Sequence, residues 1–248
     1  MAPILAVQKL YKSFGGVEAV KNVSFELEKG QLLAMIGPNG AGKSTCFNLI
    51  NGQLRPDHGR IIIMGAEING SKPRDVWKLG VGRTFQITAT LPSMTVLENV
   101  QMALLSYHGR THSLLRKVGQ LYVDESRELL EQVGIGDQAD RACGVLAYGD
   151  LKRVELAVAL ANKPRLLLMD EPTAGMGPAE RQTLMELTRH IVRTRDIGVL
   201  FTEHDMDVVF NHADRIIVLS RGELMAEGTP ADVQTNAKVK EIYLGNEE

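Results

Sequence analysis

The segment Gly37-Pro38-Asn39-Gly40-Ala41-Gly42-Lys43-Ser44 carries the strongest fold signal in this chain. Its spacing of glycines, a lysine and a hydroxyl residue matches the loop that binds nucleotide phosphates. The glycines let backbone N–H groups approach phosphate oxygens without a Cβ in the way, and a following helix adds a partial positive charge. The pattern predicts that these eight residues and Thr45 bind the nucleotide, with Lys43 on the β- and γ-phosphates and Ser44 on Mg²⁺. An ordinary glycine-rich turn is the alternative.

The segments around the loop supply the context that this interpretation needs. Residues 32–36 are continuously apolar, as in a strand buried on both faces, and residues 45–51 follow as a helix that Gly52 ends. Before the loop, apolar and polar residues alternate over residues 23–28, as in a half-buried strand. After the loop, residues 61–63 are predicted to form a further strand. The chain is therefore predicted to be β-rich up to about residue 65.

The middle of the chain changes character and the last third returns to alternation. Residues 88–163 are predicted to be helical, with a capping box formed by Thr95 and Glu98. Helices are expected over residues 124–133 and 150–162, and strands and helices then alternate over residues 166–169, 179–193 and 198–202. Residues 215–220 and 223–226, split by Arg221-Gly222, are expected to form a hairpin. We expect an α/β P-loop NTPase fold with a mostly parallel core sheet, an N-terminal antiparallel β subdomain and a helical insertion. The nucleotide-binding core takes residues 1–86 and 164–248, and the helical subdomain takes residues 87–163.

An acidic pair completes the predicted nucleotide chemistry. Asp170 and Glu171 follow the apolar run of residues 166–169, at the end of a predicted buried strand. That position places Asp170 beside Mg²⁺ and Glu171 beside the attacking water. A capping aspartate after a strand is common, so the pair gains its meaning from its order after the phosphate loop. Glu171 is expected to act as general base, and an indirect role in orienting water is the alternative.

Composition excludes several classes of protein. The chain has 28 basic and 30 acidic residues, a net charge of −2 and 5% aromatic residues, which argues against a nucleic acid partner. Cys46 and Cys143 give neither a disulfide framework nor zinc spacing, as is typical of a reducing cytosol. No apolar run approaches the about 20 residues that cross a bilayer, and no basic segment precedes apolar residues 2–7 as in a signal peptide. We expect a protein that serves any membrane from its water side.

The stretch Leu146-Ala147-Tyr148-Gly149-Asp150 opens a predicted helix just before the acidic strand. It resembles the Leu-Ser-Gly-Gly-Gln signature of the ATP-binding subunits of ABC transporters. A glycine at a helix N-terminus gives another anion-binding end, and the resemblance implies that it meets the γ-phosphate of ATP held by the opposite subunit. Ala147 lacks the signature hydroxyl and Asp150 replaces glutamine. A capped structural helix is the alternative, and the adjacent Lys152-Arg153 pair is expected on a solvated helix face.

Further positions resemble functional elements of the same family. The resemblance implies that Tyr11 stacks on adenine, that Gln86 touches Mg²⁺ and water, and that His204 faces the γ-phosphate. Residues 172–178 resemble the loop that crosses the dimer interface, with Gly177 where an aspartate or asparagine is usual. A structural tyrosine and a structural histidine are the alternatives for Tyr11 and His204.

The Ala-Tyr-Gly sequence, residues 91–100 and residues 242–245 resemble the LivG-type branch, one of two ATPases that serve high-affinity uptake of branched-chain amino acids. The resemblance runs from about residue 5 to residue 245. It implies ATP hydrolysis with ATP and Mg²⁺ as cofactors, at the cytoplasmic face of the cell membrane as a peripheral subunit.

The partners that the resemblance implies are two transmembrane permease subunits, a second ATPase subunit (the same chain or a different one) and a solute-binding protein. The alternatives are a cytosolic ABC-type ATPase of DNA repair or translation, and a P-loop kinase acting on a small metabolite. The segment between Gln86 and Leu146 is short for the coiled-coil insertion usual in the first of these.

Overall fold

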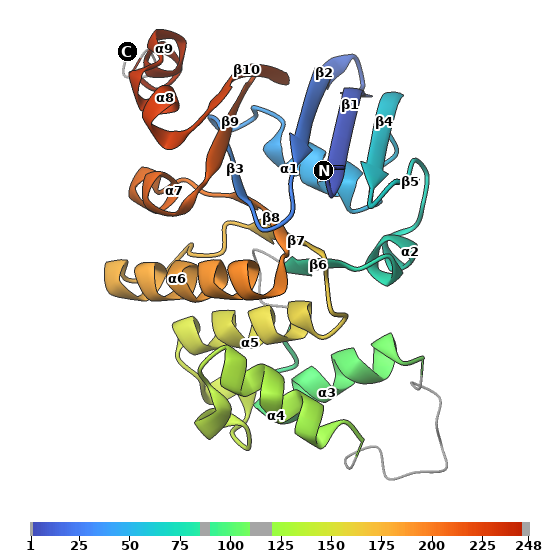
Figure 1. Cartoon of the computed structure of the whole chain (residues 1–248), viewed down its shortest axis with the longest axis vertical. Helices are drawn as coiled ribbons and strands as arrows, with labels where there is room; N and C mark the ends of the chain where they lie inside the picture. The colour runs from blue at the N-terminus through green and yellow to red at the C-terminus, as the bar shows by residue number, and fades with distance from the viewer. Residues whose placement is uncertain (1, 85–89, 110–120, 245–248) are drawn as a thin grey trace.

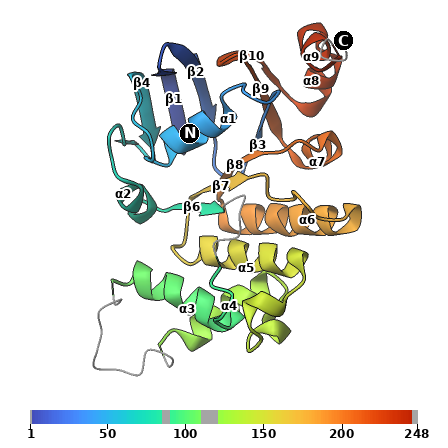
Figure 2. The ribbon, with the colours of Figure 1, turned by 180° about the vertical axis from the view of Figure 1, so that it is seen from behind.

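The computed structural model describes residues 2–84, 90–109 and 121–244. The N-terminal sheet lies at one end, the helices α3, α4 and α5 gather at the opposite end, and strands of the core sheet lie between them (Figure 1, and from behind in Figure 2). The predicted α/β fold with an antiparallel N-terminal sheet is confirmed.

The N-terminal sheet is antiparallel and has the order β2-β1-β4-β5. Its strands are β1 (Leu5–Phe14), β2 (Val17–Leu27), β4 (His58–Ile63) and β5 (Ala66–Glu67). The predicted alternation is present at the end of β2, where Val23, Phe25 and Leu27 are buried and the residues between them are exposed. This sheet therefore buries one face and leaves the other to solvent.

The core sheet has the order β10-β9-β3-β8-β7-β6 and is parallel except for the β9–β10 hairpin. Its strands are β3 (Leu32–Ile36), β6 (Val81–Thr84), β7 (Leu166–Asp170), β8 (Gly198–Thr202), β9 (Arg215–Ser220) and β10 (Glu223–Gly228). Strand β3 lies between β8 and β9, so the carboxyl end of β3 lies at a point where the strand order reverses. Ligands of open parallel sheets bind at such points.

The side chains of β3 show why this strand is apolar throughout. Leu33 and Met35 belong to the hydrophobic cluster shared by the N-terminal sheet, the core sheet and α1 (Lys43–Ile50). Leu32, Ala34 and Ile36 belong to a second cluster, shared with helices on the other face. A strand alternates its side chains between faces, so covering both faces requires an unbroken apolar run.

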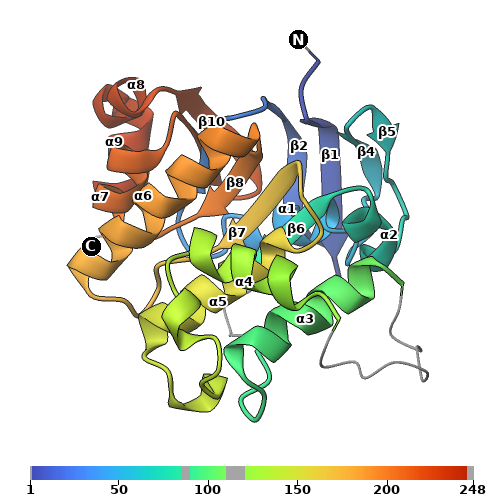
Figure 3. The ribbon, with the colours of Figure 1, turned by 60° about the horizontal axis from the view of Figure 1, so that its bottom comes forward.

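The helices beyond α1 fall into two groups. Around the insertion lie α2 (Pro73–Lys78), α3 (Val96–Tyr107), α4 (Val123–Gln132) and α5 (Tyr148–Leu160), with short turns at Gly136–Gln138 and Cys143–Val145. Beside the last strands lie α6 (Pro178–Arg195), α7 (Met206–His212), α8 (Pro230–Thr235) and α9 (Ala237–Leu244). Figure 3 shows α3, α4 and α5 as a layer at one side of the core sheet. Within the described residues, no helix is long and apolar enough to span a membrane.

The predicted helix boundaries are largely right, and two of them differ in an informative way. The capping box of α3 is confirmed, since Thr95 Oγ1 accepts from Glu98 N at 3.1 Å and Glu98 accepts from Thr95 N at 2.8 Å. Helices α1 and α5 each begin two residues before the predicted start, at Lys43 and Tyr148. In both helices the apolar periodicity begins two residues after the helical geometry, because the first residues belong to the phosphate loop and to the signature stretch.

Candidate functional site

The three glycines of the phosphate loop have different surroundings. A Cβ at Gly37 would lie 2.1 Å from Leu219 O, and one at Gly42 would lie 2.4 Å from Ala19 O. Gly40 has a φ of +78° and nothing within 4 Å of its Cβ position. Gly37 and Gly42 are therefore required by packing against β9 and β2, while Gly40 leaves open space on the side where a phosphate can approach.

Lys43 is the first residue of α1 and lies across its own loop. Its Nζ donates to Gly37 O at 2.6 Å and to Pro38 O at 3.2 Å, and only 8% of the residue is exposed. Burial lowers the pKa of this lysine, whereas the nearby carboxylates of Glu171 and Asp170 act in the opposite direction. No side chain caps the N-terminus of α1, whose N-cap residue is Gly42. The loop thus combines an ammonium group with backbone N–H groups that no side chain covers.

The acidic pair stands at the carboxyl end of β7, next to the end of β8. Asp170 Oδ1 accepts from Thr202 Oγ1 at 2.8 Å, and Asp170 Oδ2 lies 3.6 Å from a guanidinium nitrogen of Arg83. Glu171 has a φ of +48°, and its N–H points at Thr202, whose carbonyl and hydroxyl oxygens both lie at 3.1 Å. A non-glycine residue in the left-handed region is uncommon and typical of functional sites.

His204 joins this group from the loop after β8. Its Nε2 lies 3.0 Å from Glu171 Oε1, and half of its side chain is exposed. Lys43, Asp170, Glu171 and His204, which the sequence analysis assigned from separate motifs, therefore come together at the carboxyl ends of β3, β7 and β8. Gln86 lies outside the described residues.

No sequence motif assigns a role to Arg83 or Thr202, which both contact Asp170. Burial lowers the pKa of the Arg83 guanidinium, and the adjacent Asp170 acts in the opposite direction. Both residues lie at or next to the last residue of a strand beside β7, and the ends of parallel strands meet at one edge of a sheet. That register could have identified them once the strand order was known.

Of the signature residues, Tyr148, Gly149 and Asp150 form the first turn of α5, and Leu146 ends the short turn before it. Ala147 is the N-cap residue and makes no side-chain hydrogen bond to the helix, which starts at Tyr148. A Cβ at Gly149 would lie 3.0 Å from Glu180 Oε1 and 3.5 Å from the Met176 methyl group. The Tyr148 ring lies 3.2 Å from the Cβ position of Gly175. The signature therefore packs on residues 175–180, whereas the phosphate loop packs on β2 and β9.

Tyr11 lies in β1, partly exposed, with its ring edge-on to His58 at a centroid distance of 6.2 Å. Together with Lys9 and Arg60, these two rings line a hollow of about 620 Å³ on the N-terminal sheet. The structure leaves the adenine-stacking role of Tyr11 as a prediction.

The expectation that Lys152 lies on a solvated helix face is wrong. Only 3% of Lys152 is exposed, and its Nζ lies 3.1 Å from Glu155, which is 5% exposed. Helix α5 packs against α3 and α4 and contributes to the cluster shared with α6, so most of its circumference is covered. A basic residue after a motif is not by itself a sign of exposure.

Comparison with known proteins agrees with this geometry. Residues 20–174 match the ABC transporter family, and residues 223–248 match a family described as branched-chain amino acid ATP-binding cassette transporter. The high-affinity branched-chain amino acid transport ATP-binding protein LivG of Salmonella typhimurium is 37% identical over 251 residues, covering 98% of each chain. The chain belongs to the ABC transporter family. As a member of this family, the ABC chain is an ATP-binding subunit that hydrolyses ATP.

Solved structures support the same assignment. A nucleotide-free ATP-binding cassette from an ABC transporter superposes with a TM-score of 0.87 and 32% identity. The superposition covers 98% of the present chain and 99% of the cassette. A dimeric cassette in a post-hydrolysis state, bound to ADP and phosphate, gives a TM-score of 0.77 and 26% identity over 91% of the ABC chain and 98% of that chain. The match to transport proteins over nearly the whole length favours a transport ATPase over the kinase, DNA repair and translation alternatives.

Proposed function

We propose that this subunit energises an importer for branched-chain amino acids or a related small polar solute, from the cytoplasmic face of the membrane. It works with two transmembrane permeases, a second ATPase subunit and a solute-binding protein. The observation that supports the solute class is the 37% identity to LivG over 98% of both chains, together with the match of residues 223–248. Residues 87–163 are proposed as the helical subdomain that transmits motion to the permeases.

In the proposed reaction, the open side of the phosphate loop receives the triphosphate. Lys43 exchanges its contacts with Gly37 O and Pro38 O for the β- and γ-phosphates, and the uncapped start of α1 adds N–H donors. Glu171 removes a proton from the attacking water. His204, whose Nε2 lies 3.0 Å from Glu171 Oε1, faces the γ-phosphate.

The residues present fit a magnesium ion. Ser44 is exposed at the start of α1, and each Asp170 carboxylate oxygen has a second lone pair beyond its contact with Thr202 or Arg83. Hydroxyl and carboxylate oxygens are ligands that Mg²⁺ takes in proteins. Ser44, Asp170 and Gln86 would hold the ion, which supplies charge neutralisation on the phosphates.

The signature half of the site comes from a second subunit in this proposal. The start of α5 carries backbone N–H groups that no side chain caps, next to Gly149. Phosphate charge is stabilised at such a helix end. The dimeric post-hydrolysis cassette with ADP and phosphate supports an arrangement of two subunits around nucleotide.

Glu171→Gln tests the reaction in the intact membrane complex. The variant keeps the shape of the side chain but loses the base, so we expect ATP turnover to fall by at least about 100-fold with ATP binding retained. Glu186→Gln, an exposed substitution on α6, serves as the matched control and keeps the wild-type rate. Full turnover in Glu171→Gln refutes the base assignment.

Uptake of labelled leucine by the same complex, with competing amides and organic acids, tests the solute class. We expect leucine uptake that depends on ATP and that isoleucine and valine inhibit. Uptake that only an amide or an organic acid inhibits refutes the branched-chain assignment.

A further inference from the structure

Residues 172–177 follow Glu171, and residues 203–205 surround His204. A buried carboxylate joins these two loops. Glu203 Oε1 accepts from Thr173 N at 2.8 Å and from Thr173 Oγ1 at 2.6 Å, and Glu203 Oε2 accepts from His204 N at 3.2 Å. Glu203 is 4% exposed and Thr173 is 1% exposed. A buried carboxylate with three donors is a strong and geometrically specific contact.

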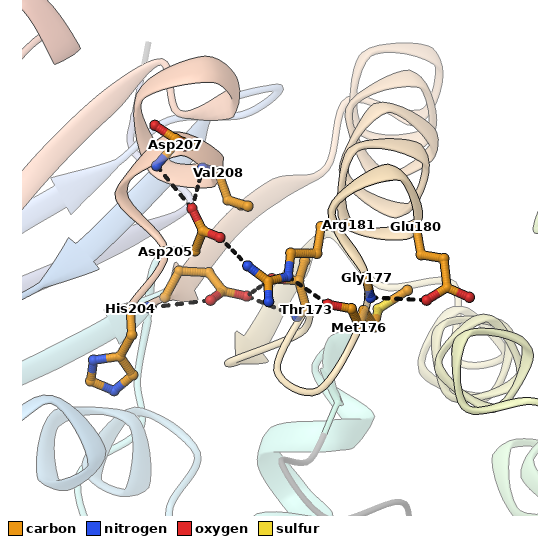
Figure 4. A network of polar contacts seen from close by, with 10 residues as sticks. Thr173, Met176, Gly177, Glu180, Arg181, His204, Asp205, Asp207 and Val208 are labelled. Carbon is orange, nitrogen blue, oxygen red and sulfur yellow. Dashed lines mark hydrogen bonds and ion pairs between the residues drawn. The ribbon is translucent and has the colours of Figure 1, made fainter.

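A guanidinium makes a second connection between the same loops. Arg181 extends from the first turn of α6, donates from Nε to Met176 O at 2.7 Å and pairs with the Asp205 carboxylate (Figure 4). Asp205 in turn caps α7, accepting from Asp207 N at 3.0 Å and Val208 N at 3.2 Å. The two connections hold both ends of residues 172–177 and both neighbours of His204.

The same loop also touches the signature end of α5. The Tyr148 ring lies against Gly175, and Gly149 is next to Met176 and Glu180. One continuous set of contacts therefore runs from the start of α5 through residues 175–177 to Arg181, and from there to the loop that carries His204. In the dimer of the proposed function, these two ends of one subunit face different ATP molecules.

We propose that Arg181 and Glu203 are positioning residues that hold residues 172–177 and His204 as one body, and thereby couple the two ATP sites of the dimer. This inference rests on the proposed function. When one ATP molecule binds at the start of α5, this helix shifts. The shift moves the imidazole of His204 relative to Glu171 at the other ATP site. Neither side chain touches the substrate in this scheme, so both act through His204.

Arg181→Met tests the second connection, because methionine fills similar space and removes both hydrogen bonds. In the intact complex we expect kcat to fall on the order of tenfold, within the range for coupled sites, with KM for ATP changed by less than about twofold. Arg193→Met is the matched control. It removes another arginine of α6 that pairs with an aspartate, Asp214, at 2.6 Å, and it keeps the wild-type kcat.

Two further measurements separate coupling from a structural role. In a double-mutant cycle of Arg181→Met with Tyr148→Ala, coupling predicts that the combined loss in kcat is smaller than the product of the two single losses. The effects of Arg193→Met and Tyr148→Ala should simply multiply. Thr173→Val loses the hydroxyl that donates to Glu203 and lowers kcat, and Thr173→Ser restores it. This second pair keeps the test valid if Arg181→Met does not fold.

An unchanged kcat in Arg181→Met, a change in KM alone, or multiplicative losses with Tyr148→Ala would overturn the inference. For a misfolded Arg181→Met, equal activity of Thr173→Val and Thr173→Ser does so. If the wild-type complex hydrolyses ATP while these results are obtained, the inference fails and the proposed function stands. A wild-type complex without ATPase activity refutes the proposed function itself.

Discussion

Gly37, Gly40 and Gly42 lie within six residues of each other, yet they are glycine for different physical reasons. At Gly37 and Gly42 a Cβ would meet a backbone carbonyl of another strand, whereas at Gly40 it would point into open space. A motif read from sequence assigns all three to phosphate binding. The structure separates the requirement of folding from the requirement of ligand access.

Alanine substitutions distinguish these two requirements. Gly37→Ala should lower the free energy of unfolding by about 3 kcal/mol, because the strained φ and the contact with Leu219 O act together. Gly40→Ala should cost only about 1 kcal/mol of stability, from its left-handed φ, and should abolish most ATP binding. Urea unfolding without nucleotide, followed by nucleotide titration, measures both. Equal losses of stability in the two variants contradict the distinction.

The buried carboxylate of Glu203 predicts a pH dependence of stability. Burial raises the pKa of Glu203 above its ordinary value of 4.5, and the hydrogen bonds from Thr173 and His204 oppose the shift. A raised carboxyl pKa means that the folded state holds the proton more tightly. Its stabilising contribution is therefore complete below about pH 4.5 and is lost as the pH rises through the folded-state pKa.

Glu203→Gln removes this titration. Relative to the wild type, the variant should gain stability as the pH rises above 4.5, and the gain should level off above the raised pKa. Denaturant unfolding of both proteins at several pH values measures the difference. A difference that does not change with pH shows that Glu203 titrates normally in the folded state.

At the scale of elements, α5 carries the least expected feature. Helix propensity and a short motif locate it, but its burial on several sides follows from its position between α3, α4 and α6. Lys152 and Glu155 are three residues apart and therefore lie on one face, where the packed helices exclude water from both. An ion pair in such a place requires both partners.

Glu155→Gln should lower the free energy of unfolding by about 1.5–3 kcal/mol, because the buried Lys152 ammonium exchanges a charged partner at 3.1 Å for a neutral amide. The double variant Lys152→Met with Glu155→Leu should recover most of that loss, since it replaces two buried charges with apolar groups. Thermal and urea unfolding of the three proteins measures the difference. Equal stability of the single and double variants contradicts a pair that depends on its partner.

The whole molecule responds to nucleotide by mass action. A ligand at 100 times its Kd stabilises the folded state by about 2.7 kcal/mol, and for a chain of this size that raises Tm by about 5–10 °C. We expect this shift with ATP and Mg²⁺, and a smaller one when EDTA removes the ion. Glu171→Gln should keep the shift and Lys43→Ala should lose it. A shift in Lys43→Ala equal to that of the wild type places the nucleotide elsewhere.

At the same scale, the sequence alone is enough to predict the P-loop NTPase fold, most of the strands and the capping box of α3. These features depend on local spacing, on periodicity and on the conformational freedom of glycine, all of which are written along the chain. The contacts between residues far apart in sequence become visible only in the folded chain: Arg83 with Asp170, Glu203 with Thr173, and Arg181 with Asp205. Strand order and helix packing bring together residues far apart in sequence, and burial strengthens a polar contact where it excludes water, as between Glu203 and Thr173.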